Sequence, residues 1–142
     1  MKTCLVVANQ TLPGETLATA IRERIAEGDR TFYVVVPLTR VSHGVTWGED
    51  ESPDAARGRL DAFLSVLGSE GVEADGEIGD PDPIQAVRDV LRGRAVDEVI
   101  LSTLPAGASR WLQRDVPSRL AREIELPLTV VTQAEAVEAA AS

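Results

Sequence analysis

The sequence predicts an α/β domain built on an open, parallel, five-stranded sheet in the strand order 3-2-1-4-5, with helices on both faces. Short apolar runs alternate along the chain with stretches whose apolar residues recur at helical spacing, the pattern of β-α-β crossovers. Several of the runs are continuously apolar, as expected for strands covered on both faces. The 142 residues suffice for one domain. We assign it to residues 1–132 and expect the Ala/Glu-rich tail, residues 133–142, to be poorly ordered.

The first half of the chain predicts two strands, each followed by a helix. Residues 4–8 form a short apolar run, and residues 17–25 follow with apolar side chains at helical spacing before a closing glycine. Residues 32–36 form the second apolar run, which Pro37 ends. The second helix starts at a serine-proline pair, residues 52–53, where serine can cap and proline suits the first helical position.

The second half predicts three more strands and two helices. Residues 72–78 alternate apolar and acidic side chains, which indicates an edge strand with one solvated face. Residues 79–83 form a turn, and residues 82–85 (Asp-Pro-Ile-Gln) resemble a capping box that starts a helix reaching about Gly93. Strand 98–101, helix 109–123 and strand 128–132 complete the domain.

The carboxyl ends of these strands are where a ligand is expected, because open parallel sheets bind ligands where the strand order reverses. The loop at residues 102–110 is the strongest candidate. It offers hydroxyls, a glycine and the start of a helix, whose free N–H groups suit a phosphate or another anion. Arg110 adds a cation in a chain of net charge −9. The candidate ligand-binding residues are Asn9, Gln10, Thr11, Pro37, Gly79, Asp80, Ser102, Thr103, Gly107, Ser109 and Arg110.

Several of these residues also have an ordinary structural explanation. Ser109 can simply cap its helix, and residues 9–11 suit a turn. Asp80 and Asp82 could form an acid–base pair, but a turn followed by a helix cap explains them better. The arginines of the fourth helix form either an anion-binding or partner-binding patch or a solvated face; they are Arg110, Arg114, Arg119 and Arg122.

Composition excludes several classes of protein. The net charge of −9 argues against nucleic-acid binding and against anionic membranes, both of which require a basic face. We find no apolar run near the ~18–20 residues of a membrane span and no secretory signal, so we expect a cytoplasmic protein. Cys4 is the only cysteine and His43 the only histidine. We therefore expect no disulfide and no metal site, with Cys4 in the core.

The order of motifs resembles the universal stress protein family over roughly residues 5–132. Residues 79–81 (Gly-Asp-Pro) precede a helix, strand 96–101 follows, and residues 126–131 (Leu-Pro-Leu-Thr-Val-Val) end the domain. The resemblance implies a Rossmann-like fold of the adenine nucleotide α-hydrolase type. It also implies a cytoplasmic regulatory protein, commonly a homodimer through its last strand, with a branch that binds ATP.

The glycine pattern of the ATP-binding branch is absent from this chain. Its three glycines and its Ser/Thr position fall on Ser102, Pro105, Asp115 and Val116. Proline removes a backbone donor, and a carboxylate repels a triphosphate. Asn9 stands where the family has an acidic residue at the end of the first strand.

The leading functional hypothesis is a universal-stress-protein-like regulatory or binding protein without catalytic turnover, homodimeric through Leu128–Thr132. The hypothesis places the ligand at the 102–110 loop. This ligand is either a nucleotide, with ATP or another adenine nucleotide as the candidate cofactor, or another small anion. One alternative is a metabolic enzyme on the same scaffold, using His43 or the pair Asp80 and Asp82. The other is a protein-docking module that pairs through its last strand.

Overall fold

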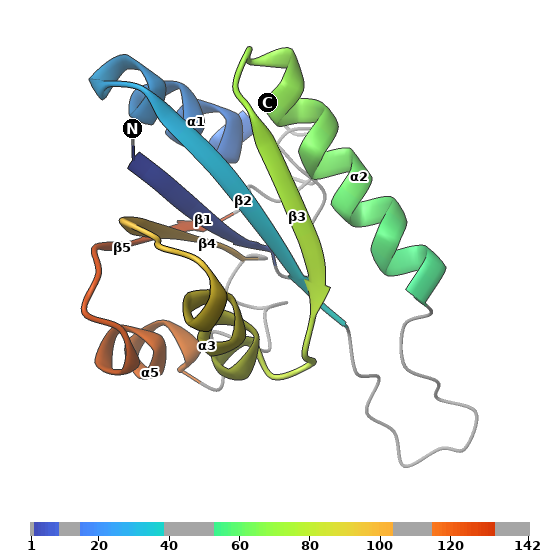
Figure 1. Cartoon of the computed structure of the whole chain (residues 1–142), viewed down its shortest axis with the longest axis vertical. Coiled ribbons are helices and arrows are strands. Elements are labelled where there is room, and N and C mark those ends of the chain that lie inside the picture. Colours follow the sequence, from blue (N-terminus) through green and yellow to red (C-terminus); the bar gives the residue numbers. More distant parts are fainter. Residues whose placement is uncertain (1, 9–14, 39–52, 104–114, 133–142) are drawn as a thin grey trace, which may run out of the picture.

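The predicted sheet is confirmed in a computed structural model, which describes residues 2–8, 15–38, 53–103 and 115–132. The strands are all parallel and lie in the order β3-β2-β1-β4-β5. The strands are β1 (Lys2–Ala8), β2 (Arg30–Pro37), β3 (Ala74–Gly79), β4 (Glu98–Thr103) and β5 (Leu128–Thr132). The helices are α1 (Glu15–Glu27), α2 (Pro53–Ser69), α3 (Pro83–Gly93) and α5 (Val116–Glu123). Figure 1 shows the central sheet with helices on both sides.

Each face of the sheet carries its own hydrophobic core. Alternate residues of β1 point to opposite faces: Val6 packs in the cluster formed with α1 and α2, and Leu5 in the cluster formed with α3 and α5. Among the described residues, the largest fully buried side chain is that of Phe63 in α2. Both faces of β1, β2 and β4 are therefore covered, which explains their continuous apolar runs.

Cys4 is a core residue, as expected. Its side chain is buried in the α1/α2 cluster. Burial and, to a smaller extent, the nearby Glu98 carboxylate raise the pKa of the thiol to about 12. The thiol is therefore protonated at neutral pH and is a poor nucleophile.

Two expected boundaries are wrong. Strand β4 continues through Ser102 and Thr103, which we expected in a loop, because both residues pair with β5 and Ser102 also pairs with Ala8 of β1. A continuous helix from residue 109 is also wrong, since α5 begins at Val116. Asp115 before it has a left-handed backbone with φ of 56°, and a proline lies in the first turn of α5. This proline, Pro117, has no N–H to donate to a preceding helical turn and suits the first turn of a new helix, which favours a fresh start at this point.

The start of α3 shows half of the expected capping box. Asp82 caps the helix, and its Oδ1 accepts a hydrogen bond of 2.9 Å from the Ile84 N–H. Gln85 does not reach back to the cap; its Nε2 donates to Asp89 Oδ1 at 2.8 Å. The cap therefore relies on Asp82 alone.

A buried ion network joins four elements near the amino ends of the strands. Glu98 of β4 accepts from Arg24 Nε of α1 at 2.8 Å and from Arg30 Nε of β2 at 2.6 Å. Arg24 Nη2 also donates to Thr129 Oγ1 of β5 at 2.7 Å. The three charged side chains keep only 7–15% of their surface exposed. Glu98 therefore links α1 to β4 and β2, the strands on either side of β1.

Candidate functional site

The strand order reverses between β1 and β4, and this switch point lies where a ligand is expected. From β1 the sheet extends through β2 to β3 on one side and through β4 to β5 on the other. Helix α1, which follows β1, packs on one face, and α5, which follows β4, packs on the opposite face. Ala8 and Ser102 are register partners at the carboxyl ends of the two strands. Such a divergence leaves the space beyond the strand ends open to a ligand.

Ser102 and Thr103 bring two buried hydroxyls to this edge. Ser102 is 4% exposed and Thr103 fully buried, and they are the buried polar residues of the part of the chain that the structure describes. Thr103 Oγ1 lies 3.5 Å from Thr132 Oγ1 and donates to it. Among residues 2–8, 15–38, 53–103 and 115–132, no group forms a hydrogen bond with the Ser102 hydroxyl. Burying a hydroxyl without a partner costs free energy, so the lack of a partner for Ser102 within the described residues requires an explanation.

Because Ser102 and Thr103 belong to a strand, their chemistry differs from that of an anion-binding loop. Their backbones pair in the ladders with the neighbouring strands. The side-chain hydroxyls, rather than a series of free N–H groups, are what these two residues offer a ligand.

Pro37, Gly79 and Asp80 lie at the same edge of the sheet but on the far side of β1. Pro37 pairs with Gly79, and the Leu38 N–H donates to the Gly79 carbonyl at 3.2 Å. Strand β3 is three strand spacings from β4, about 14 Å. A small anion at Ser102 cannot also contact Gly79, whereas a nucleotide-sized ligand can span this distance.

Packing and turn geometry explain Gly79 and Asp80. A Cβ at Gly79 would lie 2.7 Å from Val35 Cγ2 and 3.0 Å from Ala86 Cβ, so only glycine lets α3 approach the sheet here. Asp80 Oδ1 accepts from the Asp82 N–H at 2.9 Å, as in an Asx turn. The turn-and-cap explanation of Asp80 and Asp82 is confirmed, since each carboxylate bonds a different backbone N–H.

The remaining candidates lie outside the described residues. They are Asn9, Gln10, Thr11, Gly107, Ser109 and Arg110, together with His43 and Arg114. Of the candidate set, the structure therefore places Pro37, Gly79, Asp80, Ser102 and Thr103, and brings Ser102 and Thr103 together beside Ala8.

Sequence reasoning missed a polar cluster at the opposite edge of the sheet. The Tyr33 hydroxyl donates to Glu77 Oε1 at 2.6 Å, and the Arg94 guanidinium lies 3.9 Å from the centre of the Tyr33 ring. Burial raises the pKa of Tyr33, and the bond to Glu77 raises it further. A hollow of about 590 Å³ adjoins the cluster near the amino ends of β1, β2 and β3. The signal in the sequence was Tyr33 itself, the only tyrosine, placed in an otherwise apolar run.

Neither a metal site nor a membrane span is found in the described residues. There, no three His, Cys, Asp or Glu side chains gather where they could hold a metal ion. No helix in residues 15–27, 53–69, 83–93 or 116–123 has both the length and the apolar character needed to cross a membrane.

Comparison with family models and with curated proteins identifies no relative of this chain. No family model matches the chain, and no curated protein matches it. The resemblance to the universal stress protein family therefore stays a prediction from the order of motifs.

Proposed function

We propose that this protein is a regulatory or binding protein that holds a nucleotide or another small phosphate-bearing ligand at the β1/β4 switch point, without catalytic turnover. The observation that carries the proposal is the Ser102 hydroxyl, which is buried at the carboxyl end of β4, beside Ala8, and has no partner among the described residues. The confirmed strand order supports it, because ligands of this sheet type bind where the order reverses.

The resemblance to universal stress proteins supports an adenine nucleotide as the ligand. The Ser102 hydroxyl can donate to a phosphate or ribose oxygen, and Thr103 holds the end of β4 against β5 through Thr132. Arg110 completes the proposed site as the cation that offsets phosphate charge. Its place in the sequence, seven residues after the end of β4, motivates this role.

We prefer binding without turnover to the enzyme alternative because of the hydrogen bonds that the carboxylates of Asp80 and Asp82 accept. An acid–base role requires Asp80 and Asp82 to share one substrate, but their carboxylates accept hydrogen bonds from two different backbone N–H groups.

Replacing Ser102 with alanine tests the proposal. We expect affinity for the bound nucleotide to fall about tenfold, as for the loss of one hydrogen bond to a charged phosphate. The free protein should become more stable by about 1 kcal/mol or more, because the variant no longer buries a hydroxyl that has no partner within the described residues. Isothermal titration calorimetry with ATP, ADP, AMP and a cyclic nucleotide measures the first effect, and urea unfolding the second.

Ser118→Ala is the matched control, since Ser118 lies exposed on α5. Equal affinities of the wild-type protein and the Ser102→Ala variant for every ligand that binds would contradict the role of Ser102.

We further propose that β5 pairs with a second copy of the chain. Strand β5 is at the edge of the sheet, with β4 as its only strand partner among the described residues. Val130 of β5 is 41% exposed and is the exposed large hydrophobic residue of the described part of the chain. An uncovered edge with an apolar side chain invites pairing, and a two-fold dimer covers it.

Val130→Arg is expected to shift the protein from dimer to monomer in sedimentation-equilibrium experiments. A charge at this position disfavours burial in an interface. Ala121→Arg, which adds the same charge on an exposed position of α5, should leave the dimer intact. A wild-type protein that sediments as a monomer at all concentrations would contradict the proposed pairing.

A further inference from the structure

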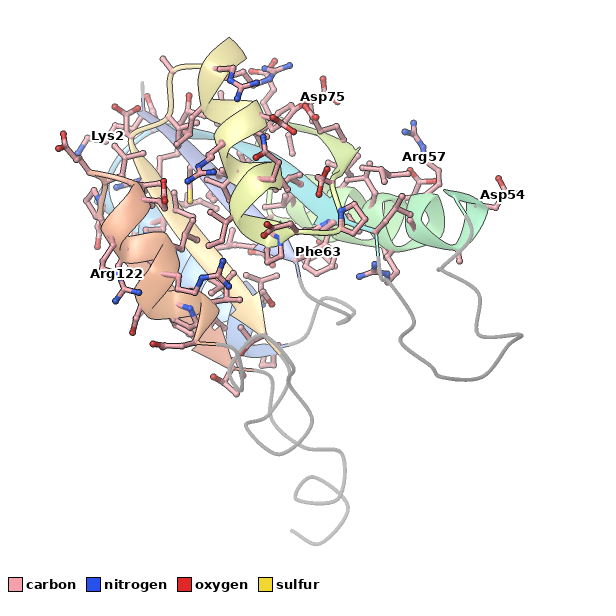
Figure 2. The ribbon with its side chains drawn as sticks, turned by 90° about the horizontal axis from the view of Figure 1, so that it is seen from below. Lys2, Asp54, Arg57, Phe63, Asp75 and Arg122 are labelled. Atoms are coloured by element: carbon pink, nitrogen blue, oxygen red, sulfur yellow. The ribbon has the colours of Figure 1, made fainter. Side chains whose placement is uncertain are left out.

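A second pocket lies between α3 and α5 and shares none of the switch-point residues. Its volume is about 190 Å³. The residues that line it are Asp82, Ile84, Arg88, Arg119, Arg122 and Glu123. Three of its six side chains are arginines, in a protein whose net charge is −9. Figure 2 labels Arg122, on the α5 side of this pocket.

One arginine and one glutamate in the pocket neutralise each other. Arg88 of α3 contacts Glu123 of α5 twice, through Nε to Oε2 at 3.1 Å and through Nη2 to Oε1 at 2.5 Å. The pairing raises the pKa of Arg88 and lowers that of Glu123. A guanidinium has five N–H donors, so three donors of Arg88 remain for another acceptor.

The second carboxylate is also engaged. Asp82 accepts the Ile84 N–H at 2.9 Å at the start of α3, where the helix dipole is positive. The negative charge of Asp82 remains, so the side chains that line the pocket carry three positive and two negative charges. Two of the positive charges are the guanidinium groups of Arg119 and Arg122, three residues apart on α5. Among the described residues, neither side chain forms an ion pair. Like charges at this spacing repel each other, and an anion between them relieves the repulsion.

We propose that this pocket binds a phosphoryl dianion, either free phosphate or the phosphate of a small phosphomonoester. A dianion can accept hydrogen bonds from the two guanidinium groups that form no ion pair within the described residues, and the pocket's excess of one positive charge favours it. Arginines on two different helices can donate to separate oxygens of a tetrahedral anion. The pocket is smaller than the 300–1,000 Å³ typical of drug-sized ligands, so it fits the phosphoryl group itself and not a whole nucleotide.

The test is a titration with inorganic phosphate against chloride at constant ionic strength, followed by calorimetry and by amide NMR shifts. The Arg119→Gln/Arg122→Gln double variant should bind phosphate at least tenfold more weakly than the wild-type protein.

The control is the double variant Arg57→Gln/Arg92→Gln, which removes the same charge from two exposed arginines outside the pocket. Arg57 lies at the far end of the molecule from Arg122 (Figure 2). This control should bind phosphate as the wild-type protein does. Equal losses in both double variants would overturn the proposal, as would the absence of phosphate-induced shifts at Ile84 and Arg88.

One further substitution is expected to strengthen phosphate binding. This effect distinguishes a change in the charge of the pocket from a general disturbance of α5. Asp82→Asn removes a negative charge from the pocket and keeps a side chain that caps helices well. It should tighten phosphate binding about threefold, as expected for one nearby charge in a partly solvated site. Unchanged or weaker binding in this variant would contradict the charge balance argued above.

Three further titrations identify the ligand and separate this site from the switch point. Binding of glycerol phosphate with at least the affinity of inorganic phosphate indicates a phosphomonoester site, and weaker binding indicates a site for free phosphate. Acetate binding as tight as phosphate binding would overturn the assignment to a dianion. In the third titration, with inorganic phosphate followed by amide NMR, shifts at Ile84 and Arg88 without shifts at Ala8 and Ser102 place the phosphate in this pocket, so either proposal can fail without the other.

Discussion

Replacing Glu98 with alanine is expected to lower the free energy of unfolding by about 3 kcal/mol, the lower end of the range for breaking a buried ion pair. The substitution leaves Arg24 and Arg30 with 15% and 7% of their side chains exposed and without their shared carboxylate. Water cannot fully replace that partner at such burial. Because whole domains are stable by only about 5–15 kcal/mol, the loss should be evident in urea unfolding.

The matched control for Glu98 is Glu27, which pairs with the same arginine from an exposed position. Glu27 Oε1 lies 3.3 Å from Arg30 Nη2, and the Glu27 side chain is 61% exposed. Glu27→Ala should therefore cost about 0.5 kcal/mol or less, as for surface ion pairs. Similar losses of unfolding free energy in the two variants would show that burial does not increase the contribution of Glu98 to stability.

Gly76→Ala is expected to destabilise the protein by about 2 kcal/mol, the usual scale for overpacking a core. A Cβ at this position would lie 2.5 Å from the Val34 carbonyl oxygen and 2.7 Å from Leu60 Cδ1. The carbonyl belongs to the neighbouring strand β2 and cannot move without disturbing the β2–β3 ladder. Thermal and urea unfolding measure the loss.

The same substitution at Gly58 should act in the opposite direction. Gly58 lies within α2, and a Cβ there would meet no atom within 4 Å. Since alanine is the better helix former, Gly58→Ala should stabilise the protein by up to about 1 kcal/mol. A loss of stability at Gly58, or none at Gly76, would contradict the packing described for α2 and β3.

The buried position of β1 and the edge position of β3 were predictable from hydrophobic patterning, whereas the full strand order was implied by the resemblance to universal stress proteins. Residues 4–8 are uniformly apolar, and the structure places β1 in the centre of the sheet with all five of these residues buried. The alternation of apolar and acidic residues in β3 predicted an edge strand with one solvated face, and β3 lies at the edge. The same reasoning placed Ser102 near the switch point from its position after an apolar run.

Features that depend on distant pairing were not predictable from local patterns. Glu98 and its partners Arg24 and Arg30 are separated by 74 and 68 residues, so nothing near Glu98 in the sequence indicates the network. The contact of Arg88 with Glu123 spans 35 residues and depends on how α3 packs against α5. The end of β4 was misjudged for a similar reason, because its ladders with two neighbouring strands extend a strand past its apolar run.

The most direct test of the central claim is an amide NMR titration of the protein with ATP, ADP, AMP and a cyclic nucleotide. If a nucleotide binds at the switch point, the largest shifts will occur at the carboxyl ends of β1 and β4, at Ala8, Ser102 and Thr103. Smaller shifts should reach the amide of Leu38, which follows β2 and donates to the Gly79 carbonyl. No binding by any of the four ligands, or shifts confined to the amino ends of the strands, would contradict the proposed site.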